Sequence, residues 1–252
     1  MPVVAIVTGA TSGIGEAFAG LLQKDNRFDA IWLVGRNLQK LSGMSKTSPK
    51  MIPVEADLTA SGVNVIEEKI IAEKASIGLL INSAGIGYRA PFEEQTPDEI
   101  NDTIQTNIAA LTKLCRVCLP YMEDGRSGII NIASTAGFLP QPGFSVYAAS
   151  KSYVISFSRA LAEELKPRRI SVTTVCTGPV ATDFQRRATG GRDTEFKGFR
   201  AKIVKTPGEV AAKALKANAK NRKMLVVGAS QKLFHFASKI IPHSWILKAI
   251  KW

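Results

Sequence analysis

The sequence predicts an α/β fold in which a mostly parallel sheet of seven strands has helices on both faces. Short apolar, β-branched runs recur seven times, at residues 3–7, 31–34, 51–54, 79–81, 129–132, 172–175 and 225–227. Longer amphipathic stretches separate them, the clearest at residues 16–24, 63–74, 97–121, 148–165 and 207–220. Strands that alternate with helices imply right-handed crossovers, and strands that are apolar throughout imply burial on both faces of a parallel sheet.

The size and composition of the chain limit the number of domains and the kind of protein it can be. Its 252 residues, 45% of them hydrophobic, favour one domain over residues 1–252 rather than two small ones. We expect neither a signal peptide nor a transmembrane helix, because no charged region with an apolar stretch begins the chain and no apolar run is long enough to span a bilayer. Three cysteines are too few for a disulfide framework, so we expect a cytoplasmic protein.

The positive charge is concentrated in the C-terminal third of the chain. The net charge is +12, and residues 1–165 carry −3 while residues 166–252 carry +15. Such an excess attracts phosphates, acidic carrier proteins, lipid headgroups or nucleic acid, although a solvated lysine surface explains it equally well. No recognised nucleic-acid motif accompanies the lysines, so we expect no nucleic-acid partner.

A glycine-rich turn joins the first strand to the first helix. Its glycines, Gly9, Gly13 and Gly15, form a Gly-x-x-x-Gly-x-Gly pattern. Glycine permits a tight bend and close approach of the backbone to a ligand, and the following helix presents free N–H groups to a pyrophosphate. The strand–turn–helix context therefore favours a dinucleotide site in a Rossmann-type doubly wound fold over a simple tight connection.

The end of the second strand, Gly35-Arg36, bears on the choice of dinucleotide. In this fold the position meets the adenosine ribose, where a carboxylate would hold the 2′-hydroxyl and repel a 2′-phosphate. Arg36 instead offers a guanidinium that can donate two hydrogen bonds to phosphate. We therefore expect NADP(H) rather than NAD(H), with a solvent-exposed arginine as the alternative interpretation.

Four polar residues form a candidate catalytic set. Tyr147 and Lys151 are four residues apart, so on a helix they share one face. A neighbouring ammonium, together with the positive charge of an oxidised nicotinamide, favours the phenolate, and we expect the two to lower the tyrosine pKa from its ordinary value of about 10. Ser134 follows a strand at the carboxyl edge, where its hydroxyl can hold a substrate oxygen. Asn107 lies inside a predicted helix, a poor place for asparagine, which indicates a hydrogen-bonding task.

The glycine turn followed by Asn107, Ser134, Tyr147 and Lys151 in this order resembles the short-chain dehydrogenase/reductase family over residues 3–183. The resemblance implies that Tyr147 exchanges a proton with the substrate oxygen, that Lys151 holds the nicotinamide ribose, and that Asn107 supports a proton relay. Ser83 and the order Gly178-Pro179 depart from the family pattern. The cofactor-binding residues that it implies are Gly9, Thr11, Ser12, Gly13, Ile14, Gly15, Arg36, Asp57, Leu58, Asn82, Ala84, Gly85, Tyr147, Lys151, Pro179, Val180 and Thr182.

Two segments outside these motifs bear on the substrate. Residues 183–205 have no periodicity and predict a lid, and residues 231–252 form a basic, apolar tail. The tail suits an interfacial membrane helix, a subunit contact or a wall of the substrate pocket. Five phenylalanines in these segments favour a medium or large hydrophobic carbonyl, 3-ketoacyl or steroid-like: Phe184, Phe196, Phe199, Phe234 and Phe236.

The sequence therefore predicts an NADP(H)-dependent oxidoreductase that interconverts a carbonyl and a secondary alcohol. The alternative is a non-catalytic NADP(H)-binding redox sensor or scaffold. We expect a homodimer or homotetramer. With only His235 and His243 available, both near the tail, no metal site is expected. Cys115 and Cys118 lie mid-helix between leucines, so we expect them to be buried and inert rather than a redox pair.

Overall fold

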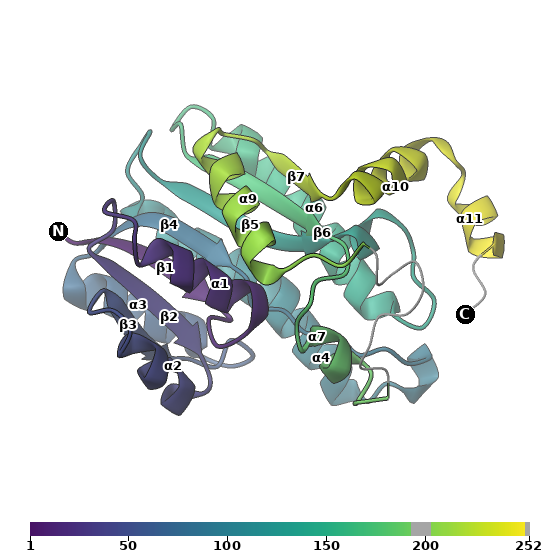
Figure 1. The fold of residues 1–252 in the computed structure, drawn as a ribbon, viewed down its shortest axis with the longest axis horizontal. Helices are drawn as coiled ribbons and strands as arrows, with labels where there is room; N and C mark the ends of the chain where they lie inside the picture. Colours follow the sequence, from purple (N-terminus) through teal and green to yellow (C-terminus); the bar gives the residue numbers. More distant parts are fainter. Residues whose placement is uncertain (193–202, 250–252) are drawn as a thin grey trace.

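The computed structural model describes residues 1–192 and 203–249, and a seven-stranded sheet forms its centre (Figure 1). The strand order is β3-β2-β1-β4-β5-β6-β7, and every neighbouring pair is parallel. All seven predicted strands and the fold class are thereby confirmed. The strands are β1 (Val3–Thr8), β2 (Ala30–Gly35), β3 (Met51–Glu55), β4 (Ser76–Asn82), β5 (Gly128–Ser134), β6 (Ser171–Thr177) and β7 (Met224–Val227).

Helices cover both faces of the sheet, as Figure 1 shows. The first strand illustrates why, because its successive side chains point to opposite faces. Ala5 and Val7 belong to one buried cluster, which includes Phe18 of α1, whereas Val4 and Ile6 belong to another. The first cluster is closed by α1 (Gly13–Leu22), α2 (Leu38–Ser45) and α9 (Pro207–Ala219), and the second by α3 (Gly62–Glu73), α5 (Leu111–Cys118) and α6 (Ser145–Glu164).

Two helices begin at the same local sequence, Thr-Pro-x-Glu. In α4 (Pro97–Ile104) the Thr96 hydroxyl accepts from the Glu99 N–H at 3.2 Å, and the Glu99 carboxylate accepts from the Thr96 N–H at 2.9 Å. The start of α9 repeats this arrangement with Thr206 and Glu209. Each capping box satisfies otherwise unpaired N–H groups, and proline at the first helical position costs no hydrogen bond.

The helix that we predicted over residues 97–121 is divided. A π-helical segment (Gln105–Ala110) separates α4 from α5, and a 3₁₀ turn (Leu119–Tyr121) follows α5. Asn107 lies in the π segment, and its side-chain amide bonds the backbone of Ile86 rather than facing the surface. A single widened turn of this kind is frequent at functional sites.

The predicted lid and tail both contain helices. The first part of the lid forms α7 (Phe184–Ala188), and residues 193–202 lie outside the described part of the chain. The tail forms α10 (Ala229–Ile240) and α11 (His243–Ala249), which extend away from the sheet beyond β7 (Figure 1). Short 3₁₀ turns lie at Phe92–Glu94 and Thr135–Phe138. Among the described residues, none of the helices is long and apolar enough to cross a membrane.

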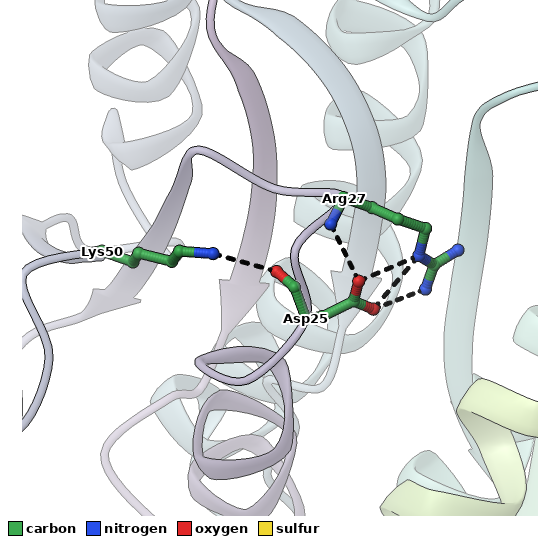
Figure 2. Close-up of polar contacts among 3 residues, drawn as sticks. All are labelled: Asp25, Arg27 and Lys50. Carbon is green, nitrogen blue, oxygen red and sulfur yellow. Dashed lines mark hydrogen bonds and ion pairs between the residues drawn. The ribbon is translucent and has the colours of Figure 1, made fainter.

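A polar clamp joins two loops (Figure 2). Asp25 follows α1, and its carboxylate accepts from the Arg27 guanidinium at 2.7 Å, while Lys50, next to β3, donates to the Asp25 carbonyl at 3.2 Å. The side-chain hydrogen bond from Arg27 is the main reason that the pKa of Asp25 lies below its ordinary value. Both loops precede strands, so the clamp lies at the edge opposite to the carboxyl ends of the strands.

Candidate active site

One cavity of about 630 Å³ lies at the carboxyl ends of the strands. It is lined by residues that follow β1, β2, β3, β4, β5 and β6, and by residues of α6, α7 and α10. The order of the sheet reverses between β1 and β4, and ligands of doubly wound sheets bind at this switch point. Of the expected site residues, all but Gly15, Asn82 and Asn107 line this cavity.

The glycine turn, which we call the cradle, packs too closely against its neighbours for its glycines to carry side chains. Gly9 and Gly13 have φ values of +64° and +55°, which favour glycine. A Cβ on Gly9 would lie 2.9 Å from the Ala84 Cα, and a Cβ on Gly13 would lie 2.8 Å from the Thr182 Cγ2. A Cβ on Gly15 would lie 2.2 Å from the Gly9 carbonyl oxygen, so Gly15 packs helix against turn rather than lining the cavity.

Thr8, which the sequence argument missed, joins the turn to the end of β4. Its buried hydroxyl accepts from the backbone N–H groups of Ser83 and Ala84 at 3.1 and 3.0 Å. These bonds hold the segment after β4 beside the glycine turn. A polar residue ending an otherwise apolar strand is the signal that could have identified Thr8.

Arg36 and Asp57 line the cavity where β2 and β3 end. The Thr59 backbone N–H and hydroxyl donate to the Asp57 carboxylate at 2.9 and 2.8 Å. These bonds hold the pKa of Asp57 below its ordinary value, and the positive charge of Arg36 adds to the effect. Asp57 is thus a negatively charged turn residue within the electrostatic reach of an exposed guanidinium.

Tyr147 lies on α6 and is almost fully buried at the cavity wall. Its ring stacks on Phe144 with centroids 4.3 Å apart, and a Cβ on Gly87 would come within 2.5 Å of the ring. Burial raises the pKa of Tyr147 to about 12, and a hydrogen bond with Ser134 opposes this rise. Lys151 does not contribute to this pKa, which burial dominates. The lowering expected from Lys151 together with the positive charge of a bound oxidised nicotinamide stays a prediction.

Lys151 lies one helical turn after Tyr147 and is also buried. Its Nζ donates to the Ile132 carbonyl at 3.0 Å and lies 5.6 Å from the centroid of the Tyr147 ring. Burial lowers the pKa of Lys151 to about 8. A Cβ on Gly85 would lie 3.2 Å from this Nζ, a tight contact that would press on the ammonium.

Asn107 is fully buried behind the cavity and connects three elements. Its Oδ1 accepts from the Ile86 N–H at 3.0 Å, and its Nδ2 donates to the Ile86 carbonyl at 2.8 Å and to the Ser150 Oγ at 2.9 Å. The Ser150 hydroxyl in turn donates to the Tyr147 carbonyl at 2.7 Å. Asn107 therefore positions the helix that carries Tyr147, and Ser150 is a connecting residue that sequence reasoning missed.

The side chain of Asn82, which we expected to bind the cofactor, points away from the cavity. The amide is buried, and its Nδ2 donates to the Asn131 Oδ1 at 2.8 Å, with the Cys115 Sγ nearby at 3.4 Å. Because it points into the core, the side chain cross-links β4 to β5 and does not line the cavity. Its Oδ1 is buried without a partner among the described residues.

The cysteine pair lies in the same core region. Cys115 and Cys118 are buried and unpaired in α5. Burial raises the pKa of Cys115 to about 12 and raises that of Cys118 as well, so both thiols are protonated at neutral pH. Since the thiolate is the reactive form of cysteine, neither thiol is activated for nucleophilic or redox chemistry.

Beside Tyr147 the cavity has an aromatic wall with basic neighbours. Phe144, Phe184 and Phe234 line it, and the Phe184 ring lies 5.2 Å from that of Tyr147. Arg89 and Arg187 line the same cavity. Phe236 is 62% exposed and belongs to the outer face of α10, contrary to the expectation that it shapes the pocket, whereas Phe196 and Phe199 lie outside the described residues.

The two ends of the lid are joined beside the cavity. Lys205 donates its backbone N–H to the Pro179 carbonyl at 3.1 Å and accepts from the Ala181 N–H at 2.9 Å. These bonds form a parallel bridge between Val180 and Lys205. The lid is therefore anchored at the segment after β6, where Val180 and Thr182 line the cavity.

Comparison with known proteins agrees with this geometry. The family model for short chain dehydrogenases matches residues 3–193. This chain belongs to the short-chain dehydrogenase/reductase family. The 3-oxoacyl-[acyl-carrier-protein] reductase FabG of Chlamydia muridarum is 31% identical over an alignment of 217 residues that covers 84% of this chain and 88% of that protein. The chain is accordingly a nucleotide-binding oxidoreductase with a small-molecule substrate.

Solved structures show the same fold. A short-chain dehydrogenase from Sphingobium yanoikuyae in complex with NADPH has a TM-score of 0.80 at 28% identity, covering 100% of this chain and 97% of that one. A short-chain dehydrogenase/reductase from Burkholderia phymatum in complex with NAD has a TM-score of 0.78 at 22% identity, covering 95% of each chain. The second likeness concerns the fold alone, and the two structures hold different dinucleotides.

Proposed function

We propose that this protein is an NADP(H)-dependent oxidoreductase that interconverts a carbonyl and a secondary alcohol on a medium or large hydrophobic substrate. The observation that carries the proposal is that Ser134, Tyr147 and Lys151 line the same cavity as the glycine turn. A hydroxyl, a phenol and an ammonium thus adjoin a dinucleotide cradle and an aromatic wall in one cavity.

The residues around the cradle fit a dinucleotide. Gly9 and Gly13 line the cavity with bare backbone, since a Cβ at either would collide with its neighbours, and the first turn of α1 presents its N–H groups there. When bound, the nicotinamide supplies or accepts the hydride. Pro179, Val180 and Thr182 are the residues that would hold the nicotinamide half, and Asp57 and Leu58 those that would adjoin the adenine.

Tyr147 is suited to give a proton to a carbonyl oxygen. Because its pKa is raised to about 12, the phenol keeps its proton throughout the neutral range. Ser134 can donate a hydrogen bond to the same oxygen as negative charge develops. Lys151, with a pKa lowered to about 8, is still mainly an ammonium at pH 7 and can return a proton toward the phenolate.

The preference for NADP(H) rests on Arg36. Its guanidinium lines the cavity after β2, where Gly35 leaves no carboxylate to repel a 2′-phosphate. A Cβ on Gly35 would meet the Thr11 Cγ2 at 3.3 Å, so the position is also too tight for an acidic side chain without adjustment.

A 3-ketoacyl thioester is the substrate class that we favour, with a steroid-like ketone second. Phe144, Phe184 and Phe234 offer an apolar wall for an acyl chain or ring system. Arg89 and Arg187 on the same cavity suit the phosphates of a thioester carrier. The relative from Chlamydia muridarum is named for a 3-oxoacyl thioester substrate.

The decisive experiment follows NADPH absorbance with 3-ketoacyl thioesters, steroids and small ketones. Tyr147→Phe should lower kcat by about 10²–10⁴-fold and leave NADPH binding intact, because only the proton donor is lost. Tyr153→Phe is the matched control, since Tyr153 lies on the same helix and its hydroxyl pairs with Thr112 at 3.0 Å outside the cavity.

Three results would change the proposal. Substantial turnover by Tyr147→Phe would reject the phenol as the acid. Turnover of small ketones alone would contradict the large hydrophobic substrate. NADPH binding without turnover of any carbonyl would favour the redox sensor or scaffold. The homodimer or homotetramer stays a prediction, to be checked by sedimentation velocity.

A further inference from the structure

The tail carries a concentrated set of exposed apolar side chains. Among the described residues, five of the thirteen large apolar side chains that are exposed lie between positions 233 and 245. Large exposed apolar side chains that cluster mark an interaction surface, whereas scattered ones need no explanation. The members of this surface, which we call the tail face, are Leu233, Phe236, Ile240, Ile241 and Trp245.

Helical spacing gathers three of these residues into one row. Leu233, Phe236 and Ile240 are three and four positions apart, so at 3.6 residues per turn they fall within an arc of roughly 60° on α10. Lys232 and Lys239 are exposed along one edge of the row. The helix is therefore amphipathic on its solvent side, with an apolar stripe and a cationic border.

The opposite side of α10 is packed, so the tail face is held in a defined place. Phe234 lines the cavity, and the His235 ring lies 4.2 Å from that of Phe138. Gln231 and Ser238 are buried. The His243 ring at the start of α11 pairs with the Ser238 carbonyl at 3.2 Å, which ties the second helix to the first.

The charge of the tail favours an anionic partner. After Glu209 the chain has nine lysines and arginines and no aspartate or glutamate, and four of the nine lie in the tail: Lys232, Lys239, Lys248 and Lys251. A second copy docked on this face through a two-fold axis would bring the same lysines together, which is unfavourable. An anionic lipid surface complements them, and an apolar row with Phe, Trp and Leu beside lysines is the pattern of a helix that lies in a bilayer interface.

We propose that the tail face docks this protein on the surface of an anionic lipid bilayer. The apolar row enters the headgroup boundary, and Lys232, Lys239 and Lys248 face the lipid phosphates. Because Phe234 on the same helix lines the cavity, docking brings the cavity close to the bilayer. The inference does not require the proposed reaction.

Vesicle co-sedimentation of the full chain tests the proposal. Binding should be strong to phosphatidylcholine mixed with phosphatidylglycerol, weak to phosphatidylcholine alone, and reduced by salt. Phe236→Ser should weaken binding about tenfold, because a large apolar side chain is lost from the row. Phe92→Ser is the matched control, since Phe92 is 63% exposed, like Phe236 at 62%, but lies far along the chain in another turn.

Tryptophan emission gives a second readout. Trp32 is fully buried, whereas Trp245 is 69% exposed, so a blue shift on adding anionic vesicles that is diminished by Trp245→Phe reports insertion of the tail face. Equal loss of vesicle binding in Phe236→Ser and Phe92→Ser, or no binding to anionic vesicles, would overturn the proposal.

Two further measurements separate the alternatives. If Phe236→Ser turns a lipid-free oligomer into a smaller species in sedimentation velocity, the tail face is a subunit interface and docking on lipid is rejected. Turnover of a soluble ketone without vesicles should be the same in Phe236→Ser and the unmodified protein. If neither turns over any carbonyl, the proposed function fails while the vesicle result still decides the docking.

Discussion

Substitution of Gly9 by alanine tests the contact between the glycine turn and the end of β4. The φ of +64° costs a residue with a Cβ about 1–2 kcal/mol. The new Cβ would also lie 2.9 Å from the Ala84 Cα, and backbone atoms must move apart to relieve this, which costs about 1–3 kcal/mol. We expect Gly9→Ala to lower the free energy of unfolding by about 2–5 kcal/mol.

Gly125→Ala supplies the control. Gly125 has a φ of +76°, so alanine has the same unfavourable conformational free energy there. The nearest atom to its Cβ would be the Arg169 Nε at 3.5 Å, an ordinary contact. Gly125 precedes β5 and does not line the cavity. Its substitution should therefore cost only about 1–2 kcal/mol.

Urea unfolding and NADPH titration measure the two consequences. Gly9→Ala should be less stable than Gly125→Ala and should raise the Kd for NADPH at least about tenfold, because 1.4 kcal/mol of lost contact corresponds to that factor. Gly125→Ala should bind NADPH like the unmodified protein. Equal stability of the two variants together with unchanged NADPH binding would refute the assignment of the turn as a cofactor cradle.

Two other substitutions give further tests. Arg36→Asp should lower the ratio of kcat/KM with NADPH to that with NADH by about tenfold to a hundredfold, because a charged hydrogen bond to the 2′-phosphate is replaced by repulsion; an unchanged ratio would count against the phosphate role. Asp25→Asn should cost about 0.2–1 kcal/mol at pH 7, since the Asp25–Arg27 pair is partly exposed and screened. The pKa of Asp25 is lowered, so this contribution is present above the ordinary carboxyl pKa of about 4 and disappears as the pH falls through the lower folded value. Urea unfolding should show the gap between Asp25→Asn and the unmodified protein close at acid pH, and a gap that persists there would contradict the ion-pair explanation.

Local patterns determined the framework of this protein. The alternation of apolar strands with amphipathic helices depends on side-chain period, which neighbouring residues set by themselves. The glycine turn needed only its strand and helix on either side to be recognised. Tyr147 and Lys151 share a face because helix geometry places residues four apart together. For these reasons the parallel sheet and the family could be predicted from the sequence.

The tertiary structure decided what depends on contacts between distant segments. It directs Asn82 into the core toward Asn131 and uses Ser150 to connect Asn107 with Tyr147. It also raises the pKa of Tyr147, because burial is a property of everything packed around the ring and not of the helix that carries it. Phe234 lines the cavity, whereas Phe236, two residues later, is exposed. The packing of α10 against Phe138 determines which of the two is covered. Periodicity identifies the two faces of a helix, but only packing against the rest of the chain decides which face is covered.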